Sequence, residues 1–115
     1  MLKTVLWVDE NPFIGRLMED ISKKEGFKLY HLNSMTEPFG YLISDLTPEI
    51  IVVEEKFLDS NQQMFWNSVK EAKFEGKLVL IGQKRDGFNN FLKKPINPFE
   101  VTKILKDLAQ WTEIR

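Results

Sequence analysis

The stretch PEIIVVEEKF, residues 48–57, holds four consecutive β-branched residues between a proline and two carboxylates. Residues 50–53 suit a strand that is buried on both faces, because β-branched side chains pack well on a pleated surface. Pro48 marks the turn that leads into this strand. The strand should end at Glu54 and Glu55, which raises the question of what two adjacent carboxylates do there.

Short β-rich runs and segments of helical periodicity alternate along the rest of the chain. Strands are predicted at residues 4–8, 28–32, 50–53, 78–81 and 91–93. Helices are predicted from Pro12 to a stop at Gly26, from a cap at Ser34 or Thr36 to about Leu46, near 61–74, and from Pro98 onward. Asn11 and Asn97 each precede a proline, a pattern typical of helix N-termini. The inward-facing residues should be Ile14, Leu17, Met18 and Ile21 in the first helix, Phe65, Val69 and Ala72 in the third, and Val101, Ile104, Leu105 and Leu108 in the last.

Near-continuous apolar strands that alternate with helices indicate a doubly wound α/β fold, in which a parallel sheet carries helices on both faces. Sites in such sheets form beyond the carboxyl ends of the strands. The residues expected there are Asp9, Glu10, Glu54, Glu55, Gly82, Gln83, Lys93, Lys94 and Pro95. Acidic residues from two strand ends and a lysine from a third should therefore converge at one edge of the sheet.

The composition is that of an ordinary soluble globular chain. With 115 residues, 43% hydrophobic and 29% charged, it should form a single domain over residues 1–115. The formal net charge of -1 gives no reason to expect nucleic acid or a membrane surface as a partner. There is no cysteine and no apolar run near the ~20 residues of a membrane span, so a cytoplasmic location is expected.

These motifs resemble the receiver domain of two-component response regulators, which has a flavodoxin-like fold. The segment VLWVDEN (5–11) looks like the family's first strand, which would make Asp9 and Glu10 the magnesium-holding positions. PEIIVVEE (48–55) looks like the third strand, with Glu54 at the phosphate-accepting aspartate. FLKKPI (91–96) looks like the fifth strand, with Lys94 at the phosphoryl-contacting lysine and Phe91 at the aromatic switch position. The resemblance implies a five-stranded parallel sheet in the order 2-1-3-4-5, with four regular helices.

Two departures from the family pattern argue against the usual phosphorylation switch. Glu54 is one methylene longer than aspartate, and in-line transfer tolerates misplacement poorly. The hydroxyl-bearing switch residue of the family falls on Gly82, which has no side chain. We therefore interpret the chain as a pseudo-receiver. Glu54 could fill the pocket or lock it, mimic the active state, or still accept a phosphoryl group.

A third departure follows from length. Only nine residues, GQKRDGFNN (82–90), separate the fourth and fifth strands, whereas a crossover that contains a helix needs ~10–12. We expect an extended loop, which could span about 30 Å. An antiparallel hairpin at Asp86-Gly87 is the alternative, but it would carry Lys94 to the wrong end of the sheet.

Four other residues have a structural interpretation as well as a functional one. His31 has no second histidine or cysteine with which to bind a metal, so a surface position or a satisfied hydrogen bond is expected. Trp7 should be a core residue. Trp66 and Trp111 could belong to the core or to an exposed aromatic patch that contacts a partner.

The sequence therefore favours a non-catalytic, phosphorylation-independent interaction module for another signalling protein, alone or as a homodimer. Magnesium at Asp9 and Glu10 is not required for this role. The alternative is a magnesium-dependent phosphoacceptor that uses Glu54. The partner surface is expected beside residues 82–90, with Arg85, Phe88 and Trp111 as contact residues, and alanine at Arg85 or Phe88 should leave thermal stability unchanged.

Overall fold

The structure is a computed structural model that describes residues 3–33 and 39–113, with side chains described as far as Leu108. Its five strands form one parallel sheet in the order β2-β1-β3-β4-β5, which confirms the predicted topology. The strands are β1 (Lys3–Val8), β2 (Phe27–Leu32), β3 (Ile50–Glu54), β4 (Lys77–Ile81) and β5 (Asn90–Leu92). The carboxyl ends of all five strands therefore meet at one edge of the sheet.

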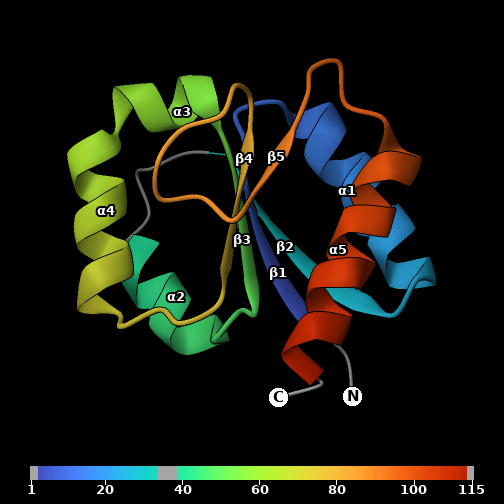
Figure 1. Ribbon diagram of the computed structural model, residues 1–115, viewed down its shortest axis with the longest axis horizontal. Coiled ribbons are helices and arrows are strands. Elements are labelled where there is room, and N and C mark those ends of the chain that lie inside the picture. The colour runs from blue at the N-terminus through green and yellow to red at the C-terminus, as the bar shows by residue number, and fades with distance from the viewer. Residues whose placement is uncertain (1–2, 34–38, 114–115) are drawn as a thin grey trace.

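Helices cover both faces of the sheet, as a doubly wound fold requires. Their bounds are α1 (Pro12–Lys24), α2 (Phe39–Leu46), α3 (Glu55–Ser60), α4 (Gln62–Glu71) and α5 (Pro98–Glu113). Figure 1 shows α1 and α5 on one face and α2, α3 and α4 on the other. The prediction of four regular helices was wrong by one, because the short helix α3 follows β3 directly and precedes the helix expected near 61–74.

The sheet divides the core into two layers. Alternate residues of the central strands face opposite sides, since side chains in a strand point up and down in turn. Val5, Trp7, Ile50 and Val52 pack toward α1 and α5, and their neighbours Leu6, Val8, Ile51 and Val53 pack toward α2, α3 and α4. All four apolar residues of β3 are 0% exposed, as its β-branched composition predicts.

The two asparagine caps predicted from the sequence are present. The side-chain oxygen of Asn11 accepts hydrogen bonds from the backbone N–H of Phe13 (3.0 Å) and Ile14 (3.4 Å). The side-chain oxygen of Asn97 accepts hydrogen bonds in the same way from Phe99 (3.0 Å) and Glu100 (3.4 Å). Both helices therefore begin beyond the carboxyl end of a strand, with their first-turn N–H groups satisfied.

Most of the predicted inner helix faces are confirmed. Met18, Phe65, Val101 and Leu105 are buried, and Ile14, Val69, Ala72, Ile104 and Leu108 pack against the core. Leu17 is an error of the prediction, because its side chain is 42% exposed. The candidate caps Ser34 and Thr36 lie outside the described residues.

The predicted tryptophan positions have three outcomes. Trp7 is a core residue with 0% exposure, as expected. Trp66 is half-buried against the layer that holds α2, α3 and α4. Trp111 lies on α5, beyond the part of the chain for which side chains are described.

Among the described residues, no helix is long and apolar enough to cross a membrane.

The connection between β4 and β5 contains no helix. Residues 82–89 form bends and a turn, and β4 pairs with β5 in parallel, which excludes the hairpin alternative. The backbone N–H of Gly82 donates to the carbonyl of Leu92 (2.8 Å), and that of Asn89 donates to the carbonyl of Leu78 (2.8 Å). The prediction of a loop crossover is therefore confirmed, and the loop is fastened to the sheet at both ends.

Candidate functional site

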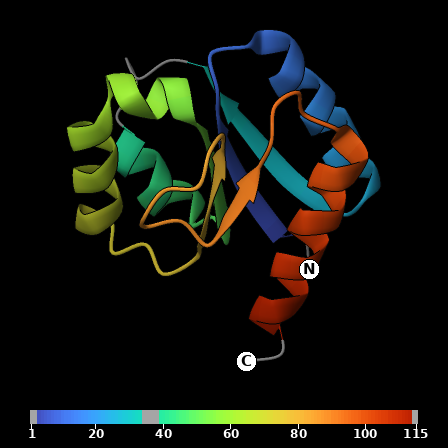
Figure 2. The same ribbon diagram turned by 45° about the horizontal axis from the view of Figure 1, so that its top comes forward.

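Four predicted site residues line one hollow at the carboxyl edge of the sheet. Asp9 and Glu10 follow β1, Glu54 ends β3, and Lys94 follows β5; Figure 2 brings this edge of the sheet forward. We call this space of about 390 Å³ the acidic hollow. Its lining residues are Asp9, Glu10, Asn11, Ile14, Glu54, Lys56, Ile81, Lys94, Pro95 and Ile96.

Both carboxylate oxygens of Glu54 have partners within the chain. Oε1 forms an ion pair with Nζ of Lys94, which is the pair expected from the sequence. Oε2 accepts a hydrogen bond of 3.0 Å from the backbone N–H of Phe57, so Glu54 is the N-cap of α3. The Glu54 side chain therefore reaches forward over the first turn of α3.

The electrostatics of this pair favour two charged groups. Burial raises the pKa of Glu54, but the hydrogen bond with Lys94 and the backbone N–H groups of Lys56 and Phe57 outweigh it and hold the pKa below its usual value. The hydrogen bond with Glu54 raises the pKa of Lys94 against the effect of burial, and the charges of Glu54, Glu55 and Asp9 raise it further. Glu54 is thus a buried carboxylate and Lys94 its ammonium partner, with about half of the Lys94 side chain exposed (47%).

Asp9 and Glu10 differ in their surroundings. Asp9 is 5% exposed, and its Oδ1 accepts a hydrogen bond of 3.0 Å from the backbone N–H of Asn11. Its carbonyl oxygen lies 2.9 Å from Nε2 of His31, so His31 has a hydrogen-bond partner, as its structural interpretation requires. Glu10 is exposed to solvent. Within the described parts of the chain, no three His, Cys, Asp or Glu side chains are grouped so that they could hold a metal ion.

Gly82 and Glu55 form a close contact that the sequence did not predict. Oε2 of Glu55 accepts a hydrogen bond of 3.0 Å from the backbone N–H of Gln83. A Cβ atom on Gly82 would lie 2.2 Å from this oxygen and 2.8 Å from the Glu55 Cβ, so the Glu55 side chain fills the space of any side chain at position 82. Gly82 also has a φ of 148°, a conformation that favours glycine. The only signal in the sequence for this contact is the adjacent pair Glu54-Glu55.

A second hollow lies beside the acidic one, and Lys94 borders both. We call it the lysine hollow; it has a volume of about 590 Å³. Its lining residues are Glu55, Gly82, Gln83, Lys84, Phe91, Lys93 and Lys94. The two switch positions, Gly82 and Phe91, therefore face this hollow, where Glu54 contributes nothing to the lining.

The proposed partner contacts Arg85 and Phe88 have neighbours within the chain. Arg85 forms an ion pair with Asp59 of α3 (2.8 Å), and its guanidinium lowers the pKa of that carboxyl. The Phe88 ring packs against Trp66 (5.4 Å between ring centroids), Phe65 (6.3 Å) and Phe91 (6.4 Å). This packing argues against the sequence-based expectation that an alanine at Phe88 would leave thermal stability unchanged.

No protein-family model matches the sequence. A chemotaxis regulatory protein, ChePep of Helicobacter pylori, is 25% identical over 113 residues, which cover 91% of this chain and 22% of that protein. The chain thus spans about a fifth of the curated relative that it matches.

Solved structures of receiver domains superimpose closely on the chain. A signal receiver domain from Vibrio parahaemolyticus has a TM-score of 0.81 at 16% identity, with 99% of this chain and 95% of that chain covered. A response-regulator receiver domain from Bermanella marisrubri gives 0.73 at 17% identity, over 95% and 99% of the two chains. Chemotaxis protein CheY4 of Vibrio cholerae gives 0.72 at 15% identity, over 94% and 99%. The chain has the flavodoxin-like fold of receiver domains.

Proposed function

We propose that this chain is a non-enzymatic pseudo-receiver domain, which acts in signal transduction as a protein-interaction module without phosphorylation. The observation that carries the proposal is the engagement of both Glu54 oxygens, one by Lys94 and the other by the N–H of Phe57. A carboxylate must free an oxygen to attack phosphorus, and here it would have to give up an ion pair or a helix cap first. The space beside Gly82, where a switch hydroxyl would act, holds the Glu55 carboxylate instead.

The signalling role rests on two kinds of likeness. The fold is similar to that of solved receiver domains, and the sequence is similar to part of a chemotaxis regulatory protein of Helicobacter pylori. We propose that residues 1–115 act as one domain in the cytoplasm and that the partner is another signalling protein. Nucleic acid and membrane surfaces are not proposed as partners, given the net charge of -1.

A magnesium-dependent phosphoacceptor is the competing function. It would use Asp9 and Glu10 for the metal and Glu54 for the phosphoryl group. Magnesium prefers near-octahedral oxygen coordination and usually takes one or two carboxylates plus water and phosphate oxygens. Asp9 and Glu10 offer carboxylates of that type, whereas Glu54 is already neutralised by Lys94. We therefore favour the interaction module.

Intact mass spectrometry tests the proposal. The purified chain is incubated with magnesium chloride and acetyl phosphate, beside a receiver domain that retains its phosphoacceptor aspartate. The mass of this chain should stay unchanged while that of the control domain rises by one phosphoryl group. A phosphorylated mass that disappears in Glu54→Gln would make Glu54 an acceptor and refute the proposal.

A magnesium titration followed by tryptophan fluorescence separates metal binding from phosphorylation. The pseudo-receiver proposal expects no saturable change in the millimolar range, because Lys94 already neutralises Glu54. The matched variant Lys94→Ala removes that cation and should gain magnesium affinity if the acidic hollow can hold the metal at all. Binding by the unaltered chain that is stronger than in Lys94→Ala would contradict the proposed role of the ion pair.

A further inference from the structure

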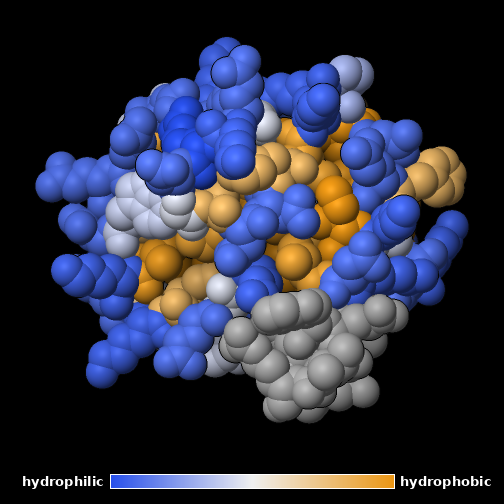
Figure 3. All heavy atoms as spheres, viewed as in Figure 1, coloured by the Kyte–Doolittle hydropathy of each residue, from blue (hydrophilic) through white to orange (hydrophobic). Residues whose placement is uncertain are grey.

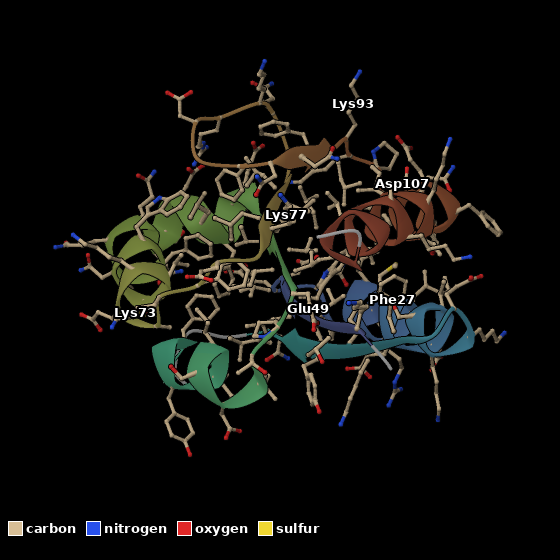
Figure 4. All side chains as sticks on the ribbon, turned by 60° about the horizontal axis from the view of Figure 1, so that its bottom comes forward. Phe27, Glu49, Lys73, Lys77, Lys93 and Asp107 are labelled. Carbon is tan, nitrogen blue, oxygen red and sulfur yellow. The ribbon has the colours of Figure 1, made fainter. Side chains whose placement is uncertain are left out.

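A hollow of about 450 Å³ lies at the amino edge of the sheet, the edge opposite the acidic and lysine hollows. It is bordered by the ends of α2 and α4 and by the segments that lead into β3 and β4. Figure 4 turns this edge toward the viewer and labels Glu49, which precedes β3, and Lys73, which follows α4. We call this space the amino-edge hollow. None of the described residues that line it borders a hollow of the carboxyl edge, so it is separate from the candidate functional site.

The floor of the amino-edge hollow is apolar. Ile43 and Pro48 are buried there, and Ala72 and Phe74 are half-buried. The Phe74 ring lies directly over Gly76, because a Cβ atom on that glycine would lie 2.6 Å from Cζ of Phe74. Small-molecule sites are typically hollows of about 300–1,000 Å³ with apolar walls and a few polar groups at defined places. The volume and the floor of this hollow are of that kind.

Charged groups of both signs stand at the rim of the same hollow. Lys73 and Glu75 are exposed, and neither forms an ion pair with any residue that the structure describes. Glu49 is half-buried, and its Oε2 accepts a hydrogen bond of 2.6 Å from the backbone N–H of Thr4. The ends of α2 and α4 add the partial negative charge of helix C-termini. The rim therefore presents an ammonium group and a carboxylate that are not paired within the described chain.

Two unfavourable backbone positions border this hollow as well. Among the described residues, the non-glycine residues with a positive φ are Thr47 and Lys73, with values of 43° and 53°. They follow the last turns of α2 and α4, where a left-handed residue is usually glycine, because glycine has no Cβ atom to clash. Glycine at either position would form the same turn but would take a side chain away from the hollow. Backbone strain of this kind concentrates at ligand sites, so it points to a role for these two side chains.

We propose that the amino-edge hollow binds a free amino acid with a large apolar side chain. The carboxylate of the ligand pairs with Lys73 and accepts a hydrogen bond from the hydroxyl of Thr47, and its ammonium group pairs with Glu75. Its side chain packs on Phe74. Lys73 and Glu75 are two residues apart, so their Cα atoms lie within about 7 Å, a span that the two charges of an amino acid can bridge. The inference goes beyond the proposed function and does not depend on it, because the hollow lies at the other edge of the sheet from Glu54.

Other ligands fit the amino-edge hollow less well. A metal ion is not favoured, since within the described residues no three His, Cys, Asp or Glu side chains are grouped around one point. A phosphate-bearing ligand would meet Glu49, Glu75 and the carbonyl ends of two helices, which repel it. A protein partner would need a wider apolar surface, whereas Figure 3 shows mostly hydrophilic residues along the lower left margin of the molecule, where α4 ends in Figure 1. An amino acid matches both charges and the apolar floor.

A nuclear magnetic resonance titration of the isotope-labelled full chain tests the proposal. The probes are L-phenylalanine, L-leucine and L-tryptophan. Saturable shifts of the backbone amide signals are expected for residues 43–47 and 72–76, which border the hollow, with dissociation constants in the millimolar range or tighter. No saturable shift with any of the three amino acids, or shifts that gather at the carboxyl edge instead, would overturn the proposal.

Two analogues of phenylalanine and two variants assign the charges. Phenethylamine lacks the carboxylate and hydrocinnamate lacks the ammonium group, so each should bind more weakly than phenylalanine. Lys73→Gln should weaken phenylalanine binding about twofold to fivefold, the usual effect of an exposed ion pair, but should not weaken phenethylamine binding. Glu75→Gln should weaken phenylalanine binding to the same extent but should not weaken hydrocinnamate binding. A variant that weakens the amino acid and its matched analogue equally would refute the assignment.

Thr47→Gly separates ligand binding from folding. Glycine relieves the φ of 43° and removes the hydroxyl from the hollow, so the variant should have a higher urea midpoint and yet bind phenylalanine about twofold to tenfold more weakly, the usual effect of one hydrogen bond. Glu19→Gln is the matched control for Glu75→Gln, since it removes the same charge from an exposed position on α1, on the other face of the sheet, and should leave affinity unchanged. Unchanged affinity in Thr47→Gly, or weaker binding in Glu19→Gln, would overturn the proposed site.

Discussion

Replacement of Gly82 by alanine tests whether the Glu55 carboxylate occupies the space of a side chain at this position. The new Cβ would lie 2.2 Å from Oε2, 2.5 Å from Cδ and 2.8 Å from Cβ of Glu55. All three distances are too short, so a rotation of the terminal carboxylate alone cannot relieve the clash. The Glu55 side chain has to rotate away and the backbone has to shift, because the Cβ atom moves only with the backbone, and the hydrogen bond of Glu55 with the N–H of Gln83 is lost.

The expected loss of stability has two parts. A non-glycine residue at a φ of 148° is strained by about 1–3 kcal/mol. Loss of the hydrogen bond between Glu55 and Gln83 adds about 0.5–1.5 kcal/mol. Gly82→Ala should therefore lower the free energy of unfolding by about 2–4 kcal/mol. Urea unfolding followed by tryptophan fluorescence measures it, since Trp7 is fully buried in the folded state.

Gly26→Ala is the matched control for backbone strain. Gly26 has a φ of 85°, and nothing lies within 4 Å of a Cβ placed on it. Alanine lowers the conformational entropy of the unfolded chain to the same extent at both positions, so this effect on the free energy of unfolding cancels when the two variants are compared. Adding Glu55→Ala to Gly82→Ala removes the contacts at 2.2 Å and 2.5 Å but leaves the Cβ–Cβ contact of 2.8 Å, so the loss should fall part of the way toward that of Gly26→Ala. Equal losses in the two single variants, or no relief in the double variant, would refute the reasoning.

Three other predictions concern stability. The pKa of Glu54 is lowered in the folded state, so the ionised carboxylate stabilises the fold above its ordinary pKa of 4.5, and this stabilisation is lost as the pH falls below that value. The difference in the free energy of unfolding between the unaltered chain and Glu54→Gln should therefore shrink at low pH, as urea titrations at several pH values would measure. Thr47 follows α2 with a φ of 43°, which is unfavourable for a β-branched residue, so Thr47→Gly should raise the free energy of unfolding by about 1 kcal/mol, measured as a higher urea midpoint. Phe88→Ala should lower that free energy by about 2 kcal/mol, and an unchanged melting temperature would mean that its ring contacts contribute nothing.

The sheet and its helices could be predicted because local signals agreed with one another. The β-branched run 50–53 predicted a strand that is buried on both faces. The Asn-Pro pairs at 11–12 and 97–98 predicted the first residues of two helices. Chain length alone predicted the loop between β4 and β5, since nine residues leave no room for a helix. These features depend on residues that are close in sequence.

The sequence could not reveal which residues at the carboxyl edge would touch. The contact between Glu55 and Gln83 joins residues 28 positions apart, and nothing in the composition of either segment requires it. The short helix α3 was missed because it depends on the Glu54 side chain as its cap, whereas glutamate is not a preferred N-cap residue. Leu17 had the correct periodicity but lies at the margin of the buried face of α1.

The adjacent carboxylates at the end of β3 serve two different surfaces, because the chain changes direction between them. Glu54 is the last residue of the strand and lines the acidic hollow, while Glu55 begins α3 and lines the lysine hollow. Lys94 borders both hollows and is attracted to both carboxylates. Glu54 therefore forms the ion pair with Lys94 and caps the first turn of α3. Glu55 holds the connection after β4 in place by accepting a hydrogen bond from the N–H of Gln83. Two side chains thus join the ends of β3, β4 and β5 across this edge, and we expect the lysine hollow to keep the same shape when a phosphodonor is added.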